Sequence, residues 1–188
     1  MPIPYTLAKL VCFCQRVRRH QPTDRRAVID GNDAALRVNY EYDAYHQISA
    51  QRVVDRPDND EVYEYDPLGH LQKVTAEYGR LTYGYDAVGN RTNRLMERQD
   101  PATQVWSELY SETYSYAATS NRLSNVARTR TTGGTTVPLR NRSFAYDDRG
   151  NIKADTRSKT ANGTTTTDVL NLDYGNSDRM NTVNVTTP

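Results

Sequence analysis

A short tyrosine-rich motif recurs along the sequence, and this repetition constrains the fold more than any other feature. Its common pattern is Tyr-x-Tyr-Asp-x-x-Gly-Asn. Clear copies occupy residues 63–71, 83–91 and 144–152, and eroded copies occupy residues 40–48, 114–122 and 172–180. Ten of the fourteen tyrosines fall on the two tyrosine positions of the motif, so chance does not explain the pattern. A motif that returns in this way indicates a repeat architecture.

Each copy predicts a β-hairpin. Tyr-x-Tyr places two aromatic side chains on one face of a strand, because side chains alternate along it. Asp-x-x-Gly suits a type I β-turn, since aspartate accepts hydrogen bonds from nearby backbone N–H groups and glycine tolerates positive φ. An apolar residue stands six positions after the motif tyrosine at Ile48, Leu71, Ile152 and Met180. We therefore expect an all-β protein, built as an antiparallel β-hairpin repeat array.

The composition agrees with a β protein that has a thin core. Hydrophobic residues make up 36% of the chain, and the mean hydropathy is −0.84. Leucine, isoleucine and valine are few, so tyrosine carries much of the apolar contact. Aromatic pairs on neighbouring strands contribute about 0.5–1.5 kcal/mol each beyond simple area burial.

Charge and cysteine content argue against several functions. The chain has 24 basic and 23 acidic residues, a net charge of +1, and no basic stripe in its repeats, which argues against nucleic-acid binding. Its two cysteines, Cys12 and Cys14, lie outside the repeats and lack a second ligand pair that would complete a metal site. No stretch has the length of a transmembrane helix. We predict neither a metal nor a cofactor.

Residues 1–35 differ from the rest of the sequence. We expect them to form an irregular basic leader, and residues 36–188 to form the hairpin array. The apolar run from Leu7 to Cys14 precedes a basic cluster, which is the reverse of the order in a secretory signal. We interpret this segment as a frayed or non-native leader.

The pattern Tyr-Asp-x-x-Gly-Asn-x resembles the YD repeat of the Rhs family, which is shared with the C components of bacterial Tc toxins and with teneurins. The match is close at residues 65–71, 85–91 and 146–152. Other copies depart from it, with His46 and Ser120 in the place of glycine. The residues to which a structural repeat role is carried over are Tyr42, Asp43, Tyr65, Asp66, Gly69, Tyr85, Asp86, Gly89, Asn90, Tyr116, Asn121, Tyr146, Asp147, Gly150, Asn151 and Tyr174.

In that family, many YD hairpins join edge to edge into a hollow β-shell around a toxic cargo. The resemblance implies that this chain is an open fragment of such a shell, a non-enzymatic structural segment that encapsulates or presents a toxin cargo. Its implied partners are further YD repeats or that cargo. Members of the family are secreted or lie at the cell surface, but this sequence does not fix a compartment.

Three alternatives stay open. The first is a tyrosine-rich surface module that binds carbohydrate or a partner protein, and the second is a truncated gene product without an independent role. The third is self-cleavage, because Asp66-Pro67-Leu68-Gly69 resembles the Asp-Pro-x-Gly of the aspartate autoprotease that ends Rhs cores. Here that sequence lies inside a repeat, where proline is ordinary at the second position of a turn. We therefore predict no catalytic residues.

Two further expectations concern the periphery of the array. The threonine-rich stretches 128–136 and 160–167 are centred on Gly133-Gly134 and Asn162-Gly163, which favours extended hairpins that reach away from the main sheet. Disordered loops are the alternative. Open sheet edges are expected near Val38–Tyr42 and near Met180–Val185, where few charges would protect them.

Overall fold

The structure is a computed structural model that describes residues 11–14, 17–18, 21–22, 24–29, 32–54, 56–174 and 179–187, with side chains from Arg37 onward. Its described elements are β-strands and one short 3-10 turn, η1 (Pro57–Asn59), which confirms the predicted all-β class. The chain divides into two compact units, Met1–Gly79 and Arg80–Pro188. The division falls inside the predicted array.

The first unit is an antiparallel array. Strands β1, β4, β5, β6, β7 and β8 are neighbours in this order, spanning Val11–Cys14, Asp24–Ile29, Asn32–Tyr42, Ile48–Val53, Glu61–Tyr65 and Leu71–Ala76. The short strands β2 (Val17–Arg18) and β3 (Gln21–Pro22) pair with each other. Strands β1 to β4 lie within the segment that the sequence analysis treats as an irregular leader, and β5 crosses its boundary.

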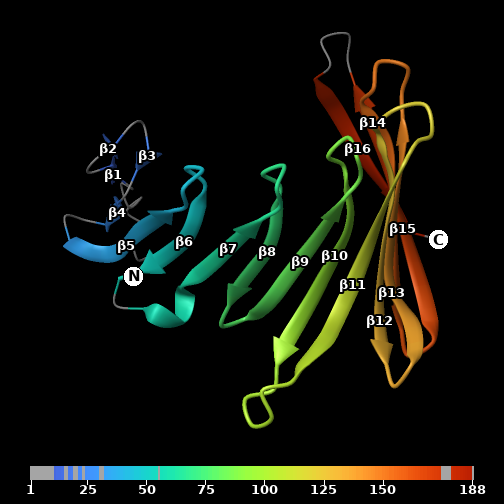
Figure 1. Cartoon of the computed structure of the whole chain (residues 1–188). Coiled ribbons are helices and arrows are strands. Elements are labelled where there is room, and N and C mark those ends of the chain that lie inside the picture. Colours follow the sequence, from blue (N-terminus) through green and yellow to red (C-terminus); the bar gives the residue numbers. More distant parts are fainter. Residues whose placement is uncertain are drawn as a thin grey trace, which may run out of the picture. The chain divides into compact units, whose positions relative to one another are not determined.

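The second unit continues the same construction with longer strands (Figure 1). Each strand pairs antiparallel with the next along the chain. The strands are β9 (Gly79–Tyr85), β10 (Arg91–Gln99), β11 (Trp106–Tyr116), β12 (Leu123–Thr132), β13 (Thr135–Tyr146), β14 (Ile152–Ala161), β15 (Thr164–Tyr174) and β16 (Met180–Thr186).

Every motif copy forms a hairpin, as predicted. The first strand of each hairpin ends at the motif tyrosine, and the second begins at the residue that pairs with it. These pairs are Tyr42 with Ile48, Tyr65 with Leu71, Tyr85 with Arg91, Tyr116 with Leu123, Tyr146 with Ile152, and Tyr174 with Met180. Next to each pair the register shifts by one residue, so a β-bulge follows every tip. Bulges increase the local twist of the strands they interrupt.

The turn of a well-preserved copy is a three-residue loop. At the third copy, Gly89 N donates to the Asp86 carbonyl at 3.1 Å, and Asp86 N donates to the Asn90 carbonyl at 2.9 Å. Gly89 has a φ of 86°, as a type I turn that ends in a left-handed residue requires. His46, which stands where glycine belongs in the first copy, takes the same region with a φ of 67°.

The fourth tip is one residue longer. Ala117 N donates to the Arg122 carbonyl at 2.9 Å, so Arg122 closes this turn, as Asn90 closes the third. Asn121 therefore lies one position before the closing residue. The added residue explains why the strand resumes at Leu123, seven positions after Tyr116.

The two threonine-rich stretches form hairpins, not disordered loops. Gly133 and Gly134 have φ values of 57° and 80°, and Asn162 and Gly163 have values of 50° and 77°. Two successive residues at positive φ make a two-residue hairpin turn. Hydroxyl pairs cross between the strands, as between Thr131 and Thr136 at 2.9 Å. Strands β12 to β15 are members of the sheet. Only the tips of the two threonine-rich hairpins extend beyond the residues that pair with the flanking strands.

The cores are thin. Among the described side chains, the buried hydrophobic residues are Val38, Ala50, Val53, Val74 and Met96. Two acidic residues, Glu112 and Asp155, are buried as well, with 6% and 3% of their surface exposed. Ion pairs therefore replace some of the apolar contacts that a deeper core would contain.

One expected edge is wrong. Strand β4 pairs with β5 through Arg25 opposite Val38 and Asp24 opposite Asn39. The segment Val38–Tyr42 therefore does not form a sheet edge. By contrast, β16 is the last strand in its sheet order, and all seven of its side chains are exposed.

Candidate functional site: the hairpin tips and the tyrosines that join them

In the tips that keep the motif aspartate, its carboxylate organises the turn. Asp86 Oδ1 accepts hydrogen bonds from Val88 N at 3.0 Å and Asn90 N at 2.8 Å. Its other oxygen, Oδ2, accepts from Asn90 Nδ2 at 3.0 Å. The aspartate and the asparagine of the motif therefore form one unit, which satisfies the backbone N–H groups of the turn.

The same unit recurs with substitutions. Asp147 bonds to the backbone and side chain of Asn151 at 2.8 and 3.1 Å. At the second tip His70 replaces the asparagine, and its Nδ1 lies 2.9 Å from Asp66 Oδ2. Asp43 Oδ1 accepts from the backbone N–H groups of Tyr45 and Gln47 at 2.8 and 2.9 Å.

These bonds favour the ionised carboxylate. The side-chain amide of Asn90, helped by backbone N–H groups, lowers the pKa of Asp86 below its usual value. At Asp66 and Asp147 desolvation opposes the shift, but hydrogen bonds from His70 and Asn151 outweigh it and lower both pKa values. The aspartates are thus held as anions by the turns that they close.

The second tyrosine of the motif joins one hairpin to the hairpin before it. Tyr65 Oη donates to the Ile48 carbonyl at 2.9 Å, Tyr116 Oη to the Arg91 carbonyl at 2.9 Å, and Tyr146 Oη to the Leu123 carbonyl at 2.7 Å. Each acceptor belongs to the first residue of the preceding hairpin's second strand. We call this recurring bond the tyrosine rung. It links tip to tip at a fixed place in the repeat.

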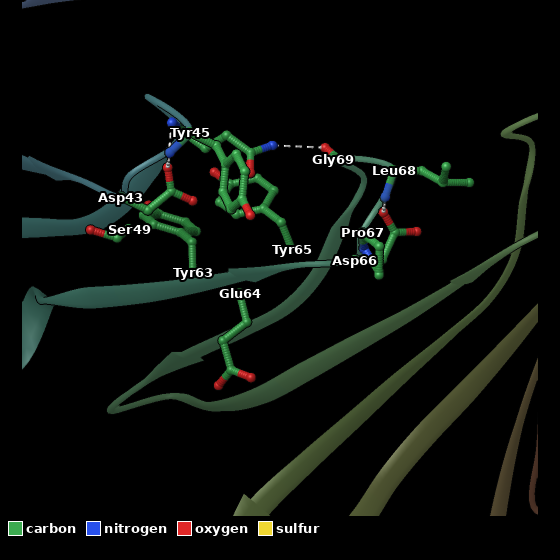
Figure 2. A pocket seen from close by; sticks show the side chains of 11 residues that line it. Asp43, Tyr45, Ser49, Tyr63, Glu64, Tyr65, Asp66, Pro67, Leu68 and Gly69 are labelled. Carbon is green, nitrogen blue, oxygen red and sulfur yellow. Dashed lines mark hydrogen bonds between the residues drawn. The ribbon is translucent and has the colours of Figure 1, made fainter.

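Side chains of the tips also touch. Gln47 Nε2 donates to the Gly69 carbonyl at 3.1 Å in the first unit (Figure 2). In the second unit, Asn90 Nδ2 donates to Asn121 Oδ1 at 3.3 Å. The motif asparagine of one tip thus reaches the added residue of the next.

The face that carries the motif tyrosines also carries ion pairs that sequence reasoning missed. Buried Glu112 pairs with Arg94 at 3.0 Å and with Arg128 at 2.6 Å. Arg128 lies 4.1 Å from the ring centre of Tyr110, and Arg91 lies 4.8 Å from that of Tyr83. Burial alone would raise the pKa of Glu112, but hydrogen bonds from Tyr114 and Arg128 and the nearby arginine charges lower it. Local motifs do not reveal the ion pairs of Glu112, because these pairs join residues 18 and 16 positions apart.

A hollow of about 780 Å³ lies between the first and second tips, entirely within the first unit (Figure 2). Tyr45, Tyr63, Tyr65 and the segment Asp66–Gly69 line it. Both oxygens of Asp66 are engaged in turn hydrogen bonds. Its carboxylate therefore closes the turn and has no oxygen left without a hydrogen bond.

The described residues offer no side-chain cluster of the kind that holds a metal ion. No group of three or more histidine, cysteine, aspartate or glutamate side chains in that part of the chain is placed to hold a metal ion. None of the described helices is long and apolar enough to span a membrane. Cys12 and Cys14 lie in β1, whose side chains are outside the described set.

The fold is similar to that of a chain in a solved structure that is much longer than this one. A crystal structure of TcdB2-TccC3-TEV matches 88% of this chain with a TM-score of 0.53 and 13% sequence identity, and the match covers 10% of that chain. Crystal structures of TcdB2-TccC3-Cdc42 and of TcdB2-TccC3 without its hypervariable C-terminal region match 89% and 90% of this chain, at 12% identity. Their matches cover 12% of those chains, and their TM-scores of 0.38 and 0.39 are too low to support an argument. No protein-family model and no curated protein matches the sequence.

Proposed function

We propose that this chain is a non-enzymatic structural segment of an Rhs-type YD-repeat shell, which encapsulates or presents a toxin cargo. Its partners are then further YD repeats or that cargo. Two observations support the proposal: the fold likeness to a chain of TcdB2-TccC3-TEV, and the repeat of Tyr-Asp-x-x-Gly at successive hairpin tips. The match to a tenth of that chain's length agrees with a segment of a larger shell.

The tyrosine rung carries the proposal. A scaffold needs a bond that repeats from hairpin to hairpin, and the rung provides one at Tyr65, Tyr116 and Tyr146. All three rings are half-buried against neighbouring strands. Tyrosines committed in this way to neighbouring hairpins favour scaffold work over display to a ligand.

The proposal is tested by attaching a protease-sensitive peptide after Pro188 and measuring its cleavage across a range of protein concentrations. A shell segment that adds edge to edge should protect the peptide as it assembles. The free peptide, mixed with the unmodified chain, is the control for non-specific protection. Cleavage of the attached and free peptides at equal rates under all conditions, assembled material included, contradicts cargo enclosure.

The absence of catalysis is tested separately at Asp66. Because this carboxylate closes a turn, the purified chain should keep its full mass on prolonged incubation, and so should the Asp66→Asn variant. Intact-mass spectrometry gives the answer. A wild-type chain that splits near Pro67 while the variant stays whole establishes a protease.

A tyrosine-rich binding module is the second candidate, favoured by the hollow between the first two tips. Tyr45 projects there with 85% of its surface exposed. An exposed ring beside a hollow suits stacking against a sugar face. The test is binding of soluble oligosaccharides to the wild type and to Tyr45→Ala. This candidate is supported if the substitution abolishes binding and leaves the fold unchanged. It is rejected if binding survives.

A further inference from the structure

Four cationic side chains on β13 and β14 form a square on one face of the sheet. Arg140 lies directly opposite Lys159, and Arg142 lies directly opposite Arg157. Like charges placed opposite each other on neighbouring strands destabilise a sheet. We call these four residues the basic square. The proposed scaffold role makes no use of it.

One buried carboxylate orients half of the square. Asp155 is 3% exposed, and its oxygens bond to Arg142 Nε and Nη2 at 2.8 and 2.6 Å. Arg157 Nε and Nη2 reach Asp155 Oδ2 at 2.9 and 2.7 Å. The two arginine side chains remain 48% and 50% exposed. Each guanidinium has five N–H donors, so several stay available to a ligand in fixed directions.

The other half of the square has no counter-charge. Arg140 and Lys159 are exposed, and their side chains make no hydrogen bond or ion pair within the described part of the chain. The four cations border a hollow of about 480 Å³, together with Thr166 and Asp168. Asp155 and Asp168 are the two carboxylates at this site, so positive charge is in excess.

We propose that the basic square binds an oxyanion of the phosphate or sulfate class. The guanidinium groups held by Asp155 present paired N–H donors, which match the spacing of oxygens on a phosphate or sulfate. Arg140 and Lys159, two residues along the same strands, supply further positive charge at the hollow. A tetrahedral oxyanion directs oxygens to both strands at once, and its charge removes the repulsion across each cationic pair.

The test uses the whole chain, with inorganic phosphate and sodium sulfate as probes and sodium chloride at matched ionic strength as the reference. Calorimetric titration should show saturable binding of phosphate or sulfate. The denaturation midpoint should rise with either anion above its value in chloride, because a ligand that binds only the folded state stabilises it. Trp106, the only tryptophan, lies in β11 of the same unit and reports unfolding by fluorescence.

The double variant Arg140→Gln with Lys159→Gln should lower the affinity about ten-fold or more, which corresponds to about 1.4 kcal/mol. It should also be more stable than the wild type in chloride, because the repulsion between strands is gone. The matched control removes two exposed cations elsewhere in the unit, through Arg98→Gln with Lys153→Gln, and should bind the probes normally.

A second variant keeps the proposal testable if the first one folds poorly. Asp168→Asn removes a carboxylate from the rim and should strengthen binding, while the Asp155 contacts stay intact. Three results would each overturn the proposal. The denaturation midpoint could respond equally to chloride and to the probes, the double variant could bind the probes as well as the wild type, or Asp168→Asn could bind them more weakly. Titration with dextran sulfate then distinguishes two sources of the oxyanion. Tighter binding of dextran sulfate than of sodium sulfate indicates a sulfated polymer, and tighter binding of the small anion indicates a free ion.

Discussion

At the scale of single residues, the well-preserved tips are held by an aspartate whose hydrogen bonds favour its ionised form and by a glycine at positive φ. Asp86 accepts from two backbone N–H groups and from the side chain of Asn90. Gly89 follows with a φ of 86°. Substitution of either residue should therefore lower the stability of the fold.

The first prediction concerns Gly89. Gly89→Val should destabilise the second unit by about 1 kcal/mol or more, since a β-branched residue is strained at positive φ. Gly89→Asn should cost less, because asparagine tolerates this region. Chemical denaturation followed by Trp106 fluorescence measures both. Equal midpoints for wild type and Gly89→Val contradict the turn geometry.

The second prediction concerns acid. Because the folded-state pKa of Asp86 is lowered, its carboxylate contributes stability above the ordinary aspartate pKa of about 4, and that contribution is lost as pH falls through the lower folded value. Asp86→Asn should therefore lower the denaturation midpoint at neutral pH and flatten its decline in acid.

Asp148→Asn serves as the matched control for Asp86→Asn. Asp148 is an exposed residue within the fifth turn, next to the motif aspartate Asp147, and no hydrogen bond of its side chain occurs within the described residues. It should leave both the neutral midpoint and the acid limb unchanged. An acid limb as steep in Asp86→Asn as in the wild type shows that this carboxylate does not stabilise the turn.

At the scale of elements, each repeat is a hairpin, and the tyrosine rung ties it to the preceding hairpin. Backbone ladders pair all neighbouring strands, whereas the rung fixes one tip against the next. Tyr116 Oη reaches the Arg91 carbonyl across 25 residues of sequence. The rung therefore contributes to register as well as to stability.

The third prediction removes a rung without removing the ring. Tyr116→Phe should lower the free energy of unfolding by about 1 kcal/mol, the usual net value of one hydrogen bond. Tyr45→Phe is the matched control, since that side chain is exposed and lies outside the motif positions. A variant with the stability of the wild type indicates that ring packing alone joins the hairpins.

The fourth prediction concerns the ion pairs of buried Glu112, one within its hairpin and one to the preceding hairpin. Glu112→Ala leaves the charges of Arg94 and Arg128 without their carboxylate and should destabilise the second unit by about 3 kcal/mol. Glu108→Ala, on the same strand and less buried, should cost less. Similar midpoints for both variants contradict a central role for Glu112.

Local chemistry made the tips predictable. Asp-x-x-Gly places its own turn, and Gly133-Gly134 and Asn162-Gly163 specify two-residue turns, so all these hairpins follow from the sequence. Substituted tips were harder to predict, because Arg122 closes its turn only after one added residue. The pairing of β4 with β5 and the pairing of Glu112 with Arg94 depend on the registers of strands that no motif turn connects. Sequence periodicity alone does not set those registers.

At the scale of the whole molecule, the chain forms two thin-cored arrays, and β16 is exposed along all its described side chains. Val183 and Val185 of β16 are 44% and 64% exposed, and the described chain pairs β16 with β15 on one side alone. Such an edge presents unpaired N–H and C=O groups to another strand. We expect this edge to promote self-association of the chain, and under the proposed shell role it would pair with a further repeat.

The most direct test of this claim is sedimentation velocity across a dilution series. The account predicts association edge to edge at micromolar concentration, reduced by Val183→Lys with Val185→Lys, which places charge on the edge. Val105→Lys, in an exposed loop, should associate like the wild type. A single monomeric boundary at every concentration, from a chain that unfolds cooperatively, contradicts the account and indicates a closed domain.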